Sequence, residues 1–233
     1  MSRIAIVAAM PGELLPLVRG WRHESRGATH LWRSKQGEDE WVAACAGAGQ
    51  QAATRAFAEI EKDGPVSAAV SVGWVGALSA EFQPSKAYWV AGVTDVRTGE
   101  RFETAADATG SPPGPWLVTS PQVADMAEKR RLAETYGAGL VDMEAAAIAR
   151  LAAMRGIPFS CIKGVSDGYA DRLPDFNRFL APDGQFQLVR FIFFAILRPW
   201  YWPGLMRMSE NSSKASQALR GYLLDNFHRP GAH

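Results

Sequence analysis

The sequence predicts an α/β domain, a three-layer α/β/α sandwich with helices on both sides of a mixed, mostly parallel central sheet. Short apolar runs rich in Val, Ile and Ala alternate with stretches of helical periodicity, the pattern typical of this class. The chain has 233 residues, 47% of them hydrophobic, which is enough to bury a substantial core. The one low-complexity patch, 110–115, is too short for a domain linker, and we expect it to be a surface loop. One large domain, or at most two small ones, is therefore expected.

The strands are predicted from the apolar runs. Two of these runs flank Gly37-Glu38-Asp39 and should form a hairpin. The expected strands cover residues 4–9, 31–34, 41–46, 68–72, 86–93 and 159–165.

The helices are predicted from apolar residues that recur on one face. Ser120 can cap one of them, and Pro121 suits its first turn. The expected helices cover residues 13–19, 50–62, 121–136, 142–155, 185–197 and 209–227, with the last residues, 228–233, frayed.

The composition excludes several classes of protein. The net charge is +1, from 25 basic and 24 acidic residues, which does not predict nucleic-acid binding. Cys45 and Cys161 lie in apolar runs and are expected to be buried thiols in a reducing cytoplasm. No apolar stretch approaches the roughly 20 residues of a membrane span. The apolar run 4–10 is short for a secretory signal and lacks a cleavage site.

Two glycine-rich segments follow predicted strands. Residues 47–52 match a loose dinucleotide-binding pattern, but the next strand ends without the acid that would hold a ribose, which favours a tight turn. Residues 72–77 are expected to form a second glycine-rich turn, either to approach an anion or sugar or to satisfy a positive φ.

Acidic residues occur at two informative places. The helix dipole explains Asp142 at a predicted helix start, but Glu144 is followed by small residues and, if buried there, needs partners. Asp167 follows a buried strand in the segment Ser166-Asp167-Gly168, where it is a candidate catalytic acid or a turn residue. The four histidines lie near no other plausible ligand, so no metal site is expected.

Taken together, these segments resemble the nucleoside phosphorylase and nucleosidase superfamily, in particular the methylthioadenosine/S-adenosylhomocysteine nucleosidases. The matching pieces occur in order over residues 1–180 and are the segments 4–10 with Glu13, 47–49, 72–77, 141–145 and 165–167. The C-terminal half also resembles the hopanoid-associated nucleoside phosphorylases, through Glu128-Lys129 and the segments 135–138, 171–174, 182–184 and 198–199. The resemblance implies a single domain over 1–233 and a homodimer that binds a small-molecule nucleoside and no cofactor.

The resemblance also implies roles for particular residues. Asp167, oriented by Ser166, would protonate the departing purine, Glu144 would bind the ribose hydroxyls, and Glu13 would activate the attacking water. Further substrate contacts would come from Met10, Gly73, Trp74, Val123 and Met143. The implied reaction is hydrolysis of a 5′-substituted adenosine, with phosphorolysis and a non-catalytic nucleoside- or lipid-binding protein as alternatives.

Departures from the superfamily pattern bear on the nucleophile. Pro16 and Ser71 stand where related phosphorylases have phosphate-binding arginines, and Trp74 replaces a small hydroxyl residue. These changes favour water over phosphate, although phosphate as a co-substrate stays open. The segment between Glu103 and Trp116 is also short, which is expected to widen the pocket at the 5′ side of the sugar.

The remaining feature is an aromatic-rich helical extension over residues 186–227, which we call the aromatic tail. Residues 186–208 contain no acid but hold several aromatic side chains with Arg190, Arg198 and Arg207. A core helix followed by a proline-rich turn explains this segment. Peripheral contact with a membrane or lipid is the alternative, because aromatic residues and arginines suit that interface.

Overall fold

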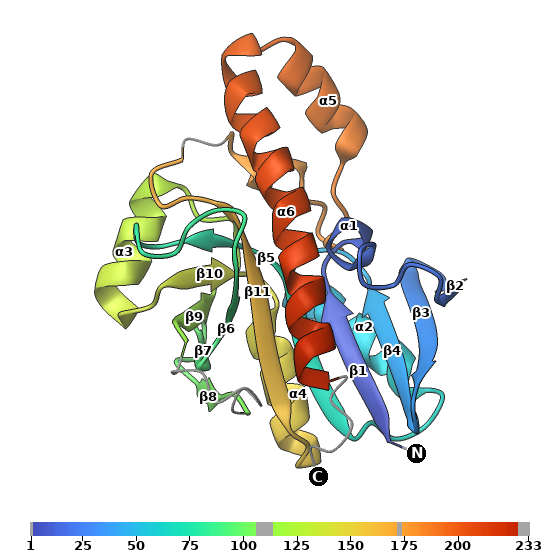
Figure 1. Ribbon diagram of the computed structural model, residues 1–233. Coiled ribbons are helices and arrows are strands. Elements are labelled where there is room, and N and C mark those ends of the chain that lie inside the picture. Colours follow the sequence, from blue (N-terminus) through green and yellow to red (C-terminus); the bar gives the residue numbers. More distant parts are fainter. Residues whose placement is uncertain (1, 106–113, 172–173, 228–233) are drawn as a thin grey trace.

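An eleven-stranded mixed sheet forms the centre of the molecule, as seen in the computed structural model, which describes residues 2–105, 114–171 and 174–227 (Figure 1). The strands are β1 (Arg3–Ala8), β2 (Arg22–Arg26), β3 (Thr29–Gln36), β4 (Asp39–Cys45), β5 (Ala68–Ala77), β6 (Ala87–Trp89), β7 (Gly92–Asp95), β8 (Arg101–Glu103), β9 (Trp116–Thr119), β10 (Leu140–Asp142) and β11 (Phe159–Asp167). The helices are α1 (Pro11–Leu14), α2 (Gln50–Glu61), α3 (Met126–Tyr136), α4 (Ala145–Arg155), α5 (Leu188–Ile196) and α6 (Trp202–Phe227), with the short helices η1 (Phe176–Phe179) and η2 (Pro199–Tyr201).

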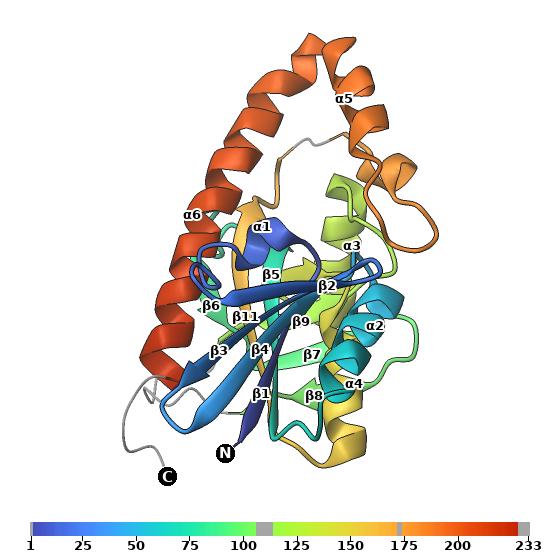
Figure 2. The ribbon, with the colours of Figure 1, turned by 90° about the vertical axis from the view of Figure 1, so that its right-hand side faces the viewer.

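The sheet is covered on both faces, which confirms the predicted α/β/α class (Figure 2). Side chains of β1 alternate between the two cores, as a strand buried on both sides requires. Ala5 and Val7 belong to the core that includes α2 and α4, whereas Ile4 and Ile6 belong to the core that includes α1 and α6. The ladders that join β4, β1, β5 and β11 are parallel, as are those that join β10, β9 and β7. Antiparallel pairing joins β5 to β10 in the middle of the sheet and attaches β2, β3, β6 and β8.

The parallel strands bring distant parts of the chain to one edge of the sheet. β5 lies between β1 and β11 and runs parallel to both. The segment after β1, the end of β5 and the end of β11 therefore lie close together, where ligands bind in open α/β sheets.

The glycine-rich segment 72–77 does not form the predicted turn. β5 continues through it to Ala77, because β11 pairs with it as far as Gly76 and β10 pairs with Gly76 and Ala77. The glycines allow other side chains to approach the strand closely. Gly73 has φ +143°, and a Cβ there would lie 2.8 Å from Glu13 Oε1.

Several other predicted bounds need correction. The expected first helix shortens to a single turn at α1, and the expected strand 86–93 divides into β6 and β7. The third helix begins at Met126 and is capped by Asp125, which accepts a hydrogen bond from Glu128 N, so Ser120 is not its cap. Asp142 ends β10 instead of opening α4. β2 is polar and was not predicted, and the predicted loop 110–115 lies largely outside the described residues.

The C-terminal helices leave the domain as a projecting pair. The second half of α6 packs on the sheet, mainly against β11. Its first half extends beyond the sheet and meets α5 at η2, at the end of the molecule opposite the start of β1 and the end of α6 (Figure 1). α5 has no buried residue, so the core-helix interpretation of this segment is wrong. We call residues 188–208 the helical tip.

Candidate active site

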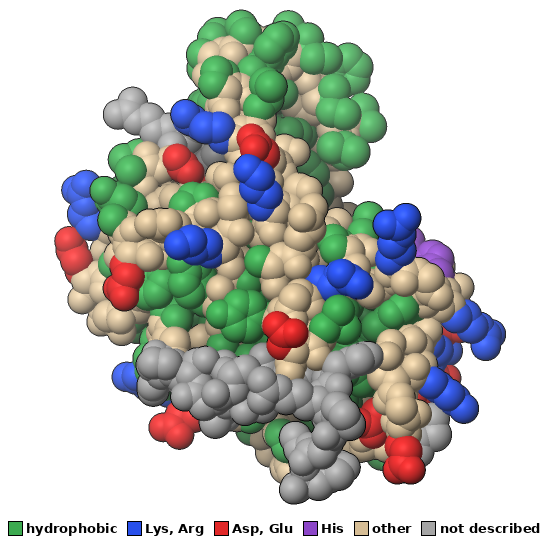
Figure 3. Space-filling view, in the orientation of Figure 1, with side chains coloured by type: hydrophobic (Ala, Val, Ile, Leu, Met, Phe, Trp, Pro, Cys, Tyr) green, Lys and Arg blue, Asp and Glu red, His purple; other side chains and the backbone are tan. Residues whose placement is uncertain are grey.

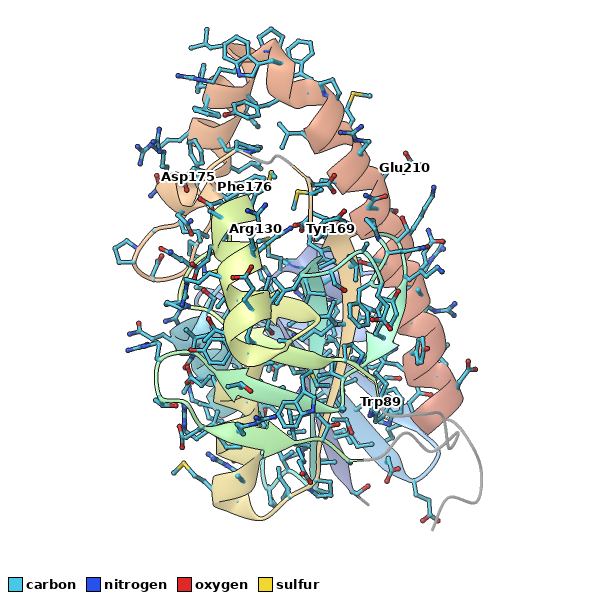
Figure 4. All side chains as sticks on the ribbon, turned by 90° about the vertical axis from the view of Figure 1, so that its left-hand side faces the viewer. Trp89, Arg130, Tyr169, Asp175, Phe176 and Glu210 are labelled. Carbon is cyan, nitrogen blue, oxygen red and sulfur yellow. The ribbon has the colours of Figure 1, made fainter. Side chains whose placement is uncertain are left out.

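A cavity of about 800 Å³ opens at the edge of the sheet where β1, β5 and β11 end. It is lined by the acids that the sequence singled out, Glu13, Glu144 and Asp167, although these residues are far apart in the chain. Its far wall comes from η1, α5 and the first half of α6. Figure 4 shows Phe176 on η1 and Glu210 on α6 just below the helical tip.

Asp167 is the last residue of β11 and is 7% exposed. Its Oδ1 accepts a hydrogen bond from Ser166 Oγ at 2.6 Å, as predicted for an orienting serine. Its Oδ2 forms an ion pair with the ammonium of Lys129 from α3, which also donates to Gly168 O at 2.7 Å. Gly76 makes room for this pair, because a Cβ there would lie 3.0 Å from Lys129 Cε and 3.1 Å from Asp167 Oδ2. Asp167 is therefore held in one orientation by two partners.

Glu13 is buried and bound by backbone amides. Its Oε2 accepts hydrogen bonds from Ala9 N and Met10 N, both at 2.8 Å, and its Oε1 accepts one from Trp74 N at 2.7 Å. Burial raises the pKa of Glu13, and the amide hydrogen bonds and the charge of Lys163 offset part of that effect. These amides fix the carboxylate against the wall of the cavity, with one lone pair of Oε1 unused by them.

Glu144 lies at the start of α4, and its Oε1 accepts a hydrogen bond from Gly49 N at 2.7 Å. Burial and the neighbouring charge of Asp142 raise the pKa of Glu144 to about 8. Beneath these acids lies Lys163, whose ammonium is 2.9 Å from Asp142 and 3.0 Å from Ser71 Oγ. Burial alone would lower the pKa of Lys163, but the surrounding acids raise it on balance, so the site has a permanent buried cation.

The raised pKa of Glu144 predicts how stability depends on pH. Between pH 4.5 and about 8 the unfolded chain releases this proton while the folded protein keeps it, so the free energy of unfolding falls as pH rises through that window. A difference of this size corresponds to at most about 5 kcal/mol. We expect Glu144→Gln to be about 2–4 kcal/mol more stable than the wild type at pH 8, with the advantage disappearing toward pH 5, as measured by urea unfolding.

Glu134→Gln provides the matched control, because Glu134 is an exposed acid on α3. The free energy of unfolding of this variant should equal that of the wild type at every pH. Parallel pH profiles for Glu144→Gln and the wild type would contradict the assignment of the raised pKa to Glu144.

Trp74, which replaces the small hydroxyl residue of related phosphorylases, forms one wall of the cavity. Its indole Nε1 donates to Ser216 Oγ at 2.8 Å and to Ser212 O at 3.1 Å, which ties β5 to α6. The ring also packs against Gly12, where a Cβ would lie 3.0 Å from it. Among the described residues that line the cavity, Lys129 alone has a cationic side chain, and it is paired with Asp167. The described lining therefore contains no unpaired cation for phosphate.

The other predicted contact residues fall into two groups. Met10, Val123 and Met143 line the cavity with Trp74 and Ser166, as expected of substrate-binding residues. Gly73 is not in the lining and instead allows the close approach of Glu13.

The dinucleotide interpretation of segment 47–52 finds no support in the structure. Ala48 N donates to Gly184 O at 2.8 Å, and a Cβ at Gly47 would lie 2.7 Å from that same oxygen. Gly49 N is bonded to Glu144. The backbone groups that would bind a pyrophosphate are thus used within the protein.

The part of the chain that the structure describes also has no cluster of His, Cys, Asp and Glu able to hold a metal. Both cysteines are free and buried, as predicted, and burial raises the pKa of each to about 12.

Two lysines in or under the site were not predicted as functional residues. Lys129 lies on α3, a helix with a mostly polar sequence, and only the fold brings this lysine next to Asp167. Lys163 lies between Ile162 and Gly164 in β11, a strand in which every residue is buried. A charge in the middle of a buried strand requires a partner, and that signal was available in the sequence.

Solved structures of several nucleosidases and hydrolases share this fold at low sequence identity. Futalosine hydrolase of Helicobacter pylori is 14% identical, with 97% of this chain and 99% of that chain covered and a TM-score of 0.73. The 5′-methylthioadenosine/S-adenosyl homocysteine nucleosidase of Helicobacter pylori is 14% identical, with 97% of each chain covered and a TM-score of 0.73. The 5′-methylthioadenosine nucleosidase of Arabidopsis thaliana is 17% identical, with 97% and 95% covered and a TM-score of 0.72. The chain thus has the α/β fold of these proteins.

A family model matches the part of the sequence that contains two of the acids. The model of the phosphorylase superfamily matches residues 101–189, a range that contains Lys129, Glu144 and Asp167. Together with the fold, this match confirms the predicted resemblance to the nucleoside phosphorylase and nucleosidase superfamily and supports an enzyme of one of these two types. No curated protein matches the sequence.

Proposed function

We propose that this protein hydrolyses the N-glycosidic bond of a 5′-substituted adenosine and releases adenine. The observation that carries the proposal is the convergence of Glu13, Glu144 and Asp167 on one cavity whose described lining has no unpaired cation. The Helicobacter pylori nucleosidase with this fold has been solved with butyl-thio-DADMe-Immucillin-A and, as a mutant, with 5′-methylthioadenosine in the active site. The proposed reaction uses no cofactor, because all groups that move protons in it come from the chain.

The acids divide the reaction between them. The oxygen of water bonds to C1′ while the bond from C1′ to the purine breaks, and the electron pair goes to the base. Glu13 accepts a proton from the water. The base gains a proton through Asp167 from the ammonium of Lys129 beside it. After the reaction Glu13 releases the proton that it took from water to the solvent, and Lys129 takes up a proton from the solvent. Glu144 hydrogen-bonds the ribose hydroxyls, and above its raised pKa of about 8 its negative form also stabilises the developing positive charge on the sugar.

The far end of the cavity supports an apolar group on the 5′ carbon. That end is lined by Leu180, Phe186, Leu188, Phe191 and Leu205, with few polar atoms among them. An apolar substituent there would bury surface at roughly 25 cal/mol per Å². A long hydrocarbon of the kind that the hopanoid resemblance implies fits this chemistry as well as a methylthio group does.

A substrate screen tests the proposal. Adenine release would be measured from methylthioadenosine, S-adenosylhomocysteine and a 5′-alkyl adenosine, each with and without phosphate. We expect release without phosphate, with the 5′-alkyl compound giving the lowest KM. Strict dependence on phosphate would replace hydrolysis by phosphorolysis. Tight binding of every compound without any release would instead identify a nucleoside-binding protein that has lost catalysis.

A further inference from the structure

The helical tip exposes large apolar side chains that the fold does not use. Val189, Phe193, Leu197, Trp200 and Met206 are each 66–72% exposed. In the space-filling view, hydrophobic side chains cover the projecting part, and charged side chains begin below it (Figure 3). An exposed apolar patch gathered on one projection indicates a site of interaction.

The inner side of the tip is packed, so this exposure does not come from a helix that has failed to dock. Phe179 of η1 makes edge-to-face contacts with Phe191 and Phe194 of α5, with ring centroids 5.4 and 5.1 Å apart. At the turn, Trp202 Nε1 donates to Ala195 O at 2.8 Å and joins α6 to α5. The tip is therefore a formed structure that presents a defined apolar outer surface.

The charges around this surface have one sign. Between Asp183 and Glu210 the sequence contains Arg190, Arg198 and Arg207 but no acid. A second copy of the chain would bring the same positive charges against one another. An anionic lipid surface complements them, and aromatic residues are common at the level of lipid headgroups.

We propose that the helical tip inserts into the surface of an anionic membrane, with its apolar outer face among the acyl chains and its arginines at the headgroups. The contact is peripheral, since no helix in the described ranges has the length and apolar character needed to cross a bilayer. The cavity is partly lined by Leu188, Leu205 and Met208 of the tip, so docking would bring its apolar end close to lipid. That last consequence rests on the proposed function, whereas the membrane contact itself does not.

Sedimentation of the full chain with vesicles tests the contact. Vesicles would contain phosphatidylcholine alone or phosphatidylcholine with phosphatidylglycerol. We expect the protein to bind the anionic vesicles, with an affinity that weakens as salt is added. The affinity should fall about fivefold in Arg190→Ser and about fivefold in Arg207→Ser. It should fall at least tenfold in the double variant Phe193→Ser, Leu197→Ser. Met154→Ser is the matched control, because Met154 is equally exposed on α4 and should bind as the wild type does.

A fluorescent label gives a second readout. Cys45 and Cys161 are buried, so a cysteine introduced as Leu197→Cys can be labelled selectively with a polarity-sensitive dye. Its emission should shift to the blue on anionic vesicles, and the same dye on Met154→Cys should not shift. Absence of vesicle binding, or a dimer in solution that the double variant disrupts, would overturn the proposal. Adenine release is assayed without vesicles, so either proposal can fail without the other.

Discussion

Replacing Asp167 with asparagine is expected to lower kcat for adenine release by about 10²–10⁴-fold. Asparagine keeps the size of the side chain and an acceptor for Ser166 Oγ, but it cannot carry a proton from Lys129 to the purine. Because Asp167 acts on the leaving group in the transition state, kcat should fall much more than the affinity for substrate changes. The measurement is single-turnover release of adenine at saturating substrate.

The variant leaves the buried ammonium of Lys129 without its partner, and that loss can destabilise the fold. The double variant Asp167→Asn, Lys129→Met removes both charges and should be folded and equally inactive. Asp225→Asn, an exposed position on α6, should keep full activity. Full activity in a folded Asp167→Asn protein would rule out the proposed acid.

Replacing Glu13 with glutamine is expected to lower the hydrolytic rate by about 10²-fold or more, because glutamine cannot accept a proton from water. Both oxygens of Glu13 accept amide hydrogen bonds, so the NH₂ group of glutamine must face an N–H group on one side. Some loss of stability is therefore expected as well. Thermal unfolding and binding of an unreactive nucleoside analogue would separate the loss of a base from the loss of the site.

Glu13→Asp keeps a carboxylate and should retain more activity than Glu13→Gln. Glu210→Gln, at an exposed acid on α6, is the control and should behave as the wild type does. If phosphate restores the activity of Glu13→Gln, then Glu13 serves water alone, and phosphate is a competent second nucleophile. Unchanged hydrolysis by a folded Glu13→Gln protein would remove Glu13 from the mechanism.

Local pattern predicted much of the fold. The β-branched run that begins at Ile4 and the periodic apolar residues of the helix at Gln50 appear as β1 and α2, because burial on two faces or on one face leaves a direct trace in the sequence. Prediction failed where pairing overrides propensity. Glycines at 73 and 76 indicated a turn, but β10 and β11 hold the chain extended there.

The candidate site, too, was predicted from the sequence only in part. Ser166 and Asp167 are neighbours, so their interaction followed from sequence and resemblance alone, as did the selection of Glu13 and Glu144. Other partners of these acids are distant in the chain: Lys129 is 38 positions from Asp167, and Gly49 is 95 positions from Glu144, so each pair meets only through the fold. No local pattern encodes such distances, because they depend on the order of the strands.

The sequence by itself determined the α/β class, the identity of the three acids and the absence of acidic residues from residues 186–208. The tertiary structure alone decided that Asp167 is paired with a lysine, that Glu144 is buried with a raised pKa, and that α5 stands outside the core. The physical reason is that residue type sets what a side chain can do, whereas burial and partners depend on contacts between distant segments. An apolar helix has the same composition whether it faces a core or a membrane, and only its neighbours distinguish the two.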